Sequence, residues 1–153
     1  MDSFDIRIID CLQRDASMSL SDIAEAVGLS STPCWRRIHN MEQAGVIQAR
    51  VAILDPVKLN VGVTVFVAIK TAQHSADWLV RFARHVDAIE EVVEFYRMSG
   101  DVDYMLRVVV PDISAYDAVY KRLIEVGGLS DVNSTFTMER IKYTTALPLS
   151  YAN

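Results

Sequence analysis

The sequence predicts an α+β protein in which a small all-helical domain precedes a domain of alternating strands and helices. Two observations lead to this fold class. Up to residue 45, apolar residues recur every three or four positions, which is the spacing of amphipathic helices. From residue 61 onward, stretches in which apolar and polar residues alternate are interleaved with helical stretches. We expect domains at residues 1–50 and 61–153, with residues 51–60, which contain Asp55–Pro56, as a connecting strand and hinge.

The chain begins with two amphipathic segments, and a glycine ends the second one. Residues 4–15 place isoleucine and leucine between charged residues, so we expect a first helix there. Residues 20–27 carry their apolar side chains on one face, with Ser19 before them as an N-cap and Gly28 after them as a stop. A third helix follows after two residues. Two short helices joined by a tight glycine turn are most often a DNA-binding helix-turn-helix.

The third predicted helix carries the side chains that a DNA-reading helix needs. It begins with Ser30 or Ser31 as its cap, and an advance of about 100° per residue gathers its apolar side chains on one face for burial. That face holds Cys34, Ile38 and Met41. The opposite face and its border carry donors for base edges and phosphates, and an indole for apolar contact. The candidate DNA contacts are Ser31, Thr32, Trp35, Arg36, Arg37 and His39.

Each basic side chain of this helix has a second interpretation. Arg36 faces outward and can reach guanine in a bidentate fork, whereas Arg37, on the flank, suits a phosphate or an internal acidic partner. His39 suits a base edge or a phosphate, and equally suits plain exposure to solvent. A surface helix can also display both arginines to water. The segment by itself therefore leaves a packing module as the alternative to a DNA reader.

The second domain is predicted to have the order βαββαβ, with both helices on one face of a four-stranded antiparallel sheet, as in ferredoxin-like folds. The predicted strands are residues 61–69, 91–98, 104–110 and 132–142, and the predicted helices are residues 76–86 and 114–126. The other face of the sheet is expected to carry large side chains, namely Phe66, Tyr96 or Phe95, Met105 and Phe136. These are too many to leave in water, so we expect face-to-face or edge pairing of the sheet with another copy of the chain.

The charge distribution bears on how such a chain would bind double-stranded DNA. A net charge of −5 argues against a protein that coats nucleic acid non-specifically. Between residues 31 and 50, three arginines stand against one glutamate, a local excess of two positive charges. One copy with so weak a patch would bind poorly. A dimer that places two reading helices one DNA turn apart doubles the phosphate contacts, so DNA binding by this chain requires oligomerisation.

Other function classes lack their signatures in this sequence. It contains no nucleophile–base arrangement, HExxH motif, CxxC pair or phosphate-binding glycine loop, so we expect no enzyme, no catalytic residue and no bound metal. Cys11 and Cys34 fall on predicted helices, which favours reduced, buried thiols. No apolar run reaches the ~18 residues that span a bilayer, and the acidic start lacks the features of a signal peptide. These features favour the cytoplasm.

Together, the helix-turn-helix, a short connecting strand ending in Leu-Asp-Pro and the βαββαβ module resemble the leucine-responsive/asparagine (Lrp/AsnC) family of transcription regulators. The resemblance covers almost the whole chain and rests on IIDCLQRDASMSLSDIAEAVGLS (8–30), PCWRRI (33–38), GVIQARVAILDP (45–56), MSGDVDYMLRVVVPDISAYD (98–117) and IKYTTALPL (141–149). It implies a winged-helix-like reader joined to a ligand-sensing domain, dimers that associate into octamers or other higher assemblies, and bending or wrapping of DNA around the assembly on the nucleoid. It also implies no cofactor other than a small effector, an amino acid. The alternative function is a small-molecule-binding regulatory subunit that does not bind DNA.

In this family the effector lies between dimers, near the loop that residues 100–104 match here. The resemblance gives Gly100, Asp101, Val102, Asp103, Tyr104 and Ser134 as candidate effector contacts. The loop suits an amino acid because its glycine frees a backbone N–H for a carboxylate and an aspartate can receive an ammonium group. The same residues also suit a plain hairpin turn. Where many relatives have two threonines on the last strand, this chain has Val132 and then Ser134, which shifts the expected preference toward an apolar effector or leaves the site altered or empty.

Overall fold

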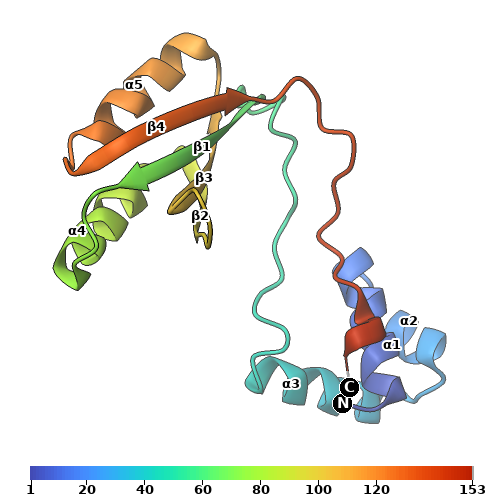
Figure 1. Ribbon diagram of the computed structural model, residues 1–153. Coiled ribbons are helices and arrows are strands. Elements are labelled where there is room, and N and C mark those ends of the chain that lie inside the picture. Colours follow the sequence, from blue (N-terminus) through green and yellow to red (C-terminus); the bar gives the residue numbers. More distant parts are fainter. Residues whose placement is uncertain (153) are drawn as a thin grey trace. The chain divides into compact units, whose positions relative to one another are not determined.

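The computed structural model describes residues 1–152, and its elements follow the predicted order (Figure 1). Three helices come first, α1 (Ser3–Arg14), α2 (Leu20–Val27) and α3 (Ser31–Gln43). They are followed by β1 (Val63–Thr71), α4 (Ala76–Asp87), β2 (Val92–Arg97), β3 (Tyr104–Val110), α5 (Ile113–Ile124), β4 (Leu129–Phe136) and the 3-10 turn η1 (Leu149–Tyr151). The predicted helix-turn-helix and the predicted βαββαβ order are therefore confirmed.

The residues group into two compact units. One unit holds Met1–Ile53 together with the segment from Ile141 onward, and the other holds Leu54–Arg140. The final segment joins the helical unit through a reciprocal pair of hydrogen bonds. The Leu147 N–H donates to Gln13 Oε1 (2.9 Å), and Gln13 Nε2 donates to the Leu147 carbonyl (3.3 Å). The domain limits expected from the sequence stay a prediction, and they assign this last segment to the other domain.

The three N-terminal helices begin and end where their caps favour it. Asp2 and Asp5 form a capping box at the start of α1. The Ser19 hydroxyl accepts the Asp22 N–H at the start of α2, which ends at Gly28 with a φ of +75°, a left-handed conformation that glycine adopts without strain. The core of this unit consists of apolar side chains from all three helices, namely Ile8, Leu12, Ile23, Ala24, Val27, Cys34, Ile38 and Met41. Both cysteines are free, and Cys11 is half-buried.

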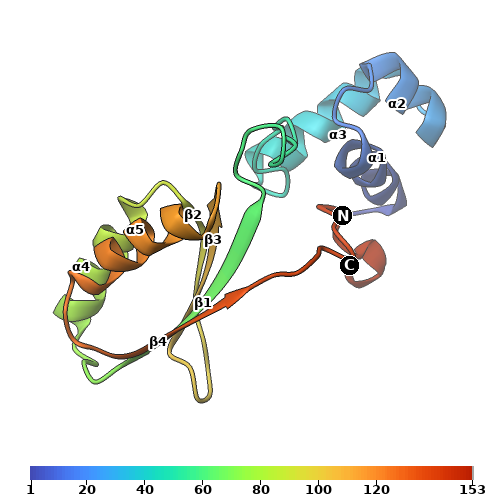
Figure 2. The ribbon, with the colours of Figure 1, turned by 90° about the horizontal axis from the view of Figure 1, so that it is seen from above.

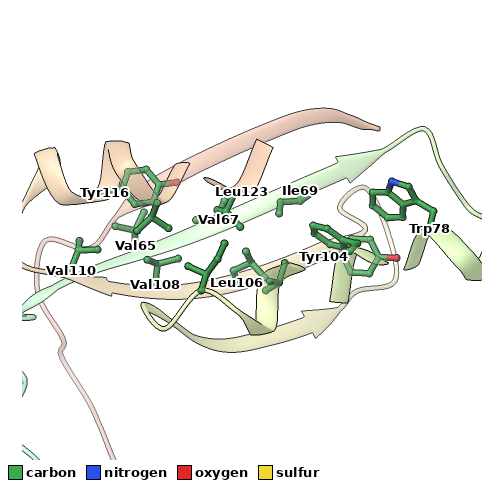
Figure 3. Close-up of a cluster of buried hydrophobic side chains, with 14 residues drawn as sticks. Val65, Val67, Ile69, Trp78, Tyr104, Leu106, Val108, Val110, Tyr116 and Leu123 are labelled. Carbon is green, nitrogen blue, oxygen red and sulfur yellow. The ribbon is translucent and has the colours of Figure 1, made fainter. Parts of the chain in front are cut away.

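The second unit is an antiparallel sheet in the order β2-β3-β1-β4, with α4 and α5 on one face (Figures 1 and 2). The period-two pattern of β1 decides which face is covered, because Val65, Val67 and Ile69 all turn toward the helices and are fully buried. Figure 3 shows these side chains together with Tyr116 and Leu123 of α5. The expected two-layer packing is therefore present.

Two predicted segments have different limits in the structure. Residues 51–60, predicted as a connecting strand and hinge, contain no strand and consist of irregular backbone followed by turns. The last strand runs over Leu129–Phe136 instead of residues 132–142, because its partner β1 determines which residues find ladder hydrogen bonds. Leu129 stands opposite Thr71 at one end of that ladder, and Phe136 stands opposite Val65 at the other.

The sheet register also corrects the predicted open face. Phe136 pairs with the inward-facing Val65, and its ring makes an edge contact with Tyr116 (5.2 Å between centroids), so it lies on the helix-covered face. Phe95 packs inward and Tyr96 is 52 % exposed, which decides between the two alternatives. The open face keeps Phe66, Tyr96 and the half-buried Met105, beside a Glu94–Arg107 ion pair of 2.6 Å. Pairing of this face with another copy stays a prediction.

Candidate nucleic-acid interface

One face of α3 is open to solvent along its length. The exposed residues include Ser31, Thr32, Trp35, Arg36 and His39, whereas Cys34, Ile38 and Met41 on the opposite face are buried. This division agrees with the two faces predicted from the sequence. A helix that is buried on one side by its own unit and free on the other has the form of a major-groove reader.

The rings of Trp35 and His39 stack on each other on the exposed face of α3. Their ring centroids lie 5.2 Å apart and their planes differ by 3°, while Trp35 remains 55 % exposed. Stacking restricts both side chains, so a ligand bound at this face would cost less conformational entropy. The Trp35 indole has apolar surface that can contact thymine methyl groups, and the His39 imidazole beside it can form hydrogen bonds.

The arginines near α3 differ in their partners. Arg37 Nη1 lies 2.7 Å from Asp2 Oδ2 and 2.7 Å from Asp5 Oδ1. Arg50 Nη2 lies 2.8 Å from Glu42 Oε1. Within the part of the chain that the structure describes, Arg36 forms no ion pair. Of the two alternatives for Arg37, the internal acidic partner is the one present here, so the free positive charge of this face is smaller than the sequence count indicated.

The loop that contains Gly100 is partly exposed and partly structural. Gly100 has a φ of +128°, and Gly100 and Asp101 are both exposed, with Val102 half-buried beside them. Asp103 ties the loop to β1, because its carboxylate accepts the Thr71 N–H (2.8 Å). The first half of the loop is therefore exposed to solvent, and Asp103 serves the turn geometry.

Tyr104 and Ser134 turn away from the loop into the interior of the sheet unit. The Tyr104 ring packs among Trp78, Phe82 and Phe95. Ser134 Oγ shares a short hydrogen bond with the Tyr116 hydroxyl beneath α5, and burial raises the pKa of that phenol. In the register, Tyr104 and Val132 both stand opposite Ile69, whereas Ser134 stands opposite Val67. The structure therefore brings Val132, and not Ser134, into the strand row next to the loop.

Thr71 belongs to this end of the sheet, although the sequence reasoning did not single it out. Its side chain is buried, and its hydroxyl donates to the Gly128 carbonyl (2.8 Å) while its N–H goes to Asp103. Thr71 thus links the loop after β2 to the glycine turn before β4. The available signal was positional, since residue 71 continues the inward series of β1 and yet is polar.

The described residues also bear on two other kinds of site. Residues 1–152 contain no group of three or more His, Cys, Asp or Glu side chains that could hold a metal ion. None of their helices has the length and apolar character that a membrane span requires.

Comparison with known proteins yields two matching protein-family models. The AsnC-type helix-turn-helix domain matches residues 1–42, and the Lrp/AsnC ligand binding domain matches residues 64–147. Among named relatives, the glutamate uptake regulatory protein of Zymomonas mobilis is 49 % identical over 149 residues, covering 97 % of this chain and 91 % of the relative. The DNA-binding transcriptional activator DecR of Escherichia coli is 49 % identical over 150 residues, covering 97 % and 99 %.

Solved structures resemble the chain over its full length. An AsnC family transcriptional regulator from Agrobacterium tumefaciens superposes with a TM-score of 0.95 at 62 % sequence identity, covering 99 % of both chains. A transcriptional regulator from Neisseria meningitidis in complex with L-Met superposes with a TM-score of 0.94 at 31 % identity, covering 100 % of this chain and 99 % of that one.

Proposed function

The chain belongs to the Lrp/AsnC family of DNA-binding transcriptional regulators, and we propose that it reads duplex DNA through the exposed face of α3 and responds to an amino acid bound in its sheet unit. The observation that carries the first part is the open row of Ser31, Thr32, Trp35, Arg36 and His39. Such a row presents the Arg36 guanidinium and the stacked rings of Trp35 and His39 to base edges. Direct readout in the major groove requires hydrogen-bond donors and apolar contacts of this kind. As a regulator of chromosomal genes, the protein acts on the nucleoid in the cytoplasm.

The weak charge of the reading face supports an oligomer. Arg36 is the arginine of this face without an acidic partner among the described residues, and one cation per copy gives little phosphate affinity. Two or more copies that bind one duplex add their contacts. We therefore propose a dimer as the minimum binding unit and an octamer as the larger assembly, with the exposed Phe66 and Tyr96 at the sheet-face contact between copies.

The effector part of the proposal rests on the exposed half of the loop after β2. Gly100 leaves a backbone N–H accessible to a carboxylate, and Asp101 is exposed beside it to receive an ammonium group. The relative from Neisseria meningitidis, whose structure holds L-Met, supports an amino acid as the ligand class. Val132 in the strand row next to the loop packs against the core and offers no hydroxyl to a polar side chain, so we infer an amino acid with an apolar side chain. Asp103 and Tyr104 support the loop from the interior of the sheet unit. Ser134 acts only through its hydrogen bond to Tyr116 and does not contact the effector.

The test of DNA reading compares two single substitutions. Arg36→Ala is expected to weaken binding to a duplex selected by the wild-type protein by about 1–3 kcal/mol, the value of a bidentate base contact. Arg14→Ala, which removes the same charge from the exposed surface of α1, is the matched control and should bind like wild type. Equal binding by both variants, or wild-type binding that ignores sequence, would support a ligand-binding subunit that does not read DNA. A thermal-shift screen of the twenty amino acids then identifies the effector, since a ligand that binds only the native state raises its melting temperature.

A further inference from the structure

Arg37, the residue after Arg36, links α3 to the N-terminus of α1. Arg37 extends from the middle of α3 to the first turn of α1, where Asp2 and Asp5 both accept from its Nη1 atom at 2.7 Å. Its guanidinium also lies 5.4 Å from the centroid of the Phe4 ring, within the range of a cation–π contact. The Arg37 side chain is 30 % exposed and Asp5 is 16 % exposed, so the contact is partly shielded from water.

Asp2 and Asp5 each accept hydrogen bonds both from backbone N–H groups at the start of α1 and from Arg37. One oxygen of Asp2 accepts the N–H groups of Phe4 and Asp5, and one oxygen of Asp5 accepts the N–H of Asp2. The remaining oxygen of each faces Arg37. The carboxylates therefore have fixed places before the arginine arrives, because the helix cap holds them. The hydrogen bonds to Asp5 and Asp2 raise the pKa of the Arg37 guanidinium, and the N–H of Asp5, together with Arg37, lowers the pKa of the Asp2 carboxyl.

We propose that Arg37 is a positioning residue that holds the reading helix α3 at a set angle on α1 and makes no contact with DNA itself. This inference rests on the proposed reading face of α3. The two carboxylates accept hydrogen bonds from the Arg37 guanidinium and neutralise its charge, so Arg37 has little left to offer a phosphate. Arg37 thus supports DNA reading through geometry, whereas its neighbour Arg36 does so through contact.

The two possible roles predict opposite signs for one substitution. If Arg37 orients α3, Asp5→Asn loosens the helix and weakens DNA binding. If Arg37 is a phosphate contact that Asp5 partly neutralises, Asp5→Asn frees the cation, removes a negative charge and strengthens DNA binding. Asp5 belongs to the first turn of α1 and is not one of the exposed residues of α3.

The experiment measures binding of the full-length variants to the duplex selected by wild type, at several salt concentrations and at a temperature where circular dichroism shows every variant folded. We expect Arg37→Ala and Asp5→Asn each to bind roughly tenfold more weakly, and their double variant to bind no more weakly than the worse single one, because both remove the same contact. The slope of log affinity against log salt should stay at its wild-type value in both. If Arg37 instead contacted a phosphate, its loss would change that slope by about 0.9 for each copy on the duplex. Arg36→Ala, which removes the proposed base contact, is the comparison variant.

Arg37→Lys keeps a charge between the carboxylates without the planar fork, and we expect it to recover part of the affinity. Tighter binding by Asp5→Asn, or a reduced salt slope in Arg37→Ala, would overturn the inference. Wild-type affinity in both folded variants would overturn it as well, since the contact would then serve stability alone. If wild type itself shows no sequence-specific binding, and Arg36→Ala binds as well as wild type, the proposed reading face is wrong. That result differs from one in which only the role of Arg37 is wrong.

Discussion

Replacing Gly128 by alanine is expected to destabilise the sheet unit much more than the same change at its neighbour Gly127. Both glycines have left-handed backbones, with φ of +69° at Gly127 and +76° at Gly128. An added methyl group at Gly127 meets no atom within 4 Å, but at Gly128 it lies 2.8 Å from Gln73 Cγ and 2.8 Å from Trp78 Nε1. The Gln73 side chain is exposed and can move away, whereas the Trp78 indole is buried and is held in place by the atoms packed around it.

The expected free energies follow from these contacts. The left-handed conformation costs an L residue about 1 kcal/mol at either place. At Gly128 the methyl group also displaces the Trp78 indole, whose N–H donates to the Gly127 carbonyl at 3.2 Å. A buried donor that loses its partner costs about 1–3 kcal/mol. We therefore expect losses of about 1 kcal/mol for Gly127→Ala and about 2–4 kcal/mol for Gly128→Ala.

Urea unfolding monitored by tryptophan fluorescence measures the difference. The chain has two tryptophans, and Trp35 lies in the helical unit while Trp78 lies in the sheet unit. In a Trp35→Phe background the emission reports the sheet unit alone. Protein concentration must be the same for all variants, because association shifts apparent stability. Equal destabilisation by the two alanines would refute the steric argument and leave backbone strain as the whole effect.

Three further predictions concern single side chains. Hydrogen bonding to Arg107 holds the pKa of the Glu94 carboxyl below its ordinary value near 4.5, so the pair stabilises the fold above that pH and the contribution is lost as pH falls through the lowered value. Glu94→Gln should accordingly flatten the acid side of a stability profile, and an unchanged profile contradicts this. Gly100→Val should abolish the response of DNA binding to the amino acid, because valine is strained at a φ of +128°; a normal response in DNA titrations would place the effector elsewhere. Burial raises the pKa of the Cys34 thiol, so iodoacetamide should label Cys11 first in peptide mass spectra, and early labelling at Cys34 argues against a closed helical core.

The sequence by itself determined the elements and their caps, because these depend on neighbours a few residues apart. A period near 3.6 with Ser19 and Gly28 at its ends is sufficient to define α2, and the alternation in β1 is sufficient to define its covered face. The division of α3 into a buried and an exposed side could be read in the same way, since helical geometry alone sets it. These local rules predicted the fold class and the row of side chains proposed to read DNA.

Only the tertiary structure decided which side chains meet across long distances in the chain. The register of β4 on β1 placed Phe136 on the covered face and Val132 beside the loop, and a shift of one residue in this pairing would move every side chain of β4 to the other face. The partner of Arg37 lies 32 residues away in Asp5, and Thr71 joins Asp103 to Gly128 from three separate segments. Each of these contacts needs the chain to be closed into its final packing before the interacting atoms are neighbours, so a one-dimensional pattern could not pair these residues.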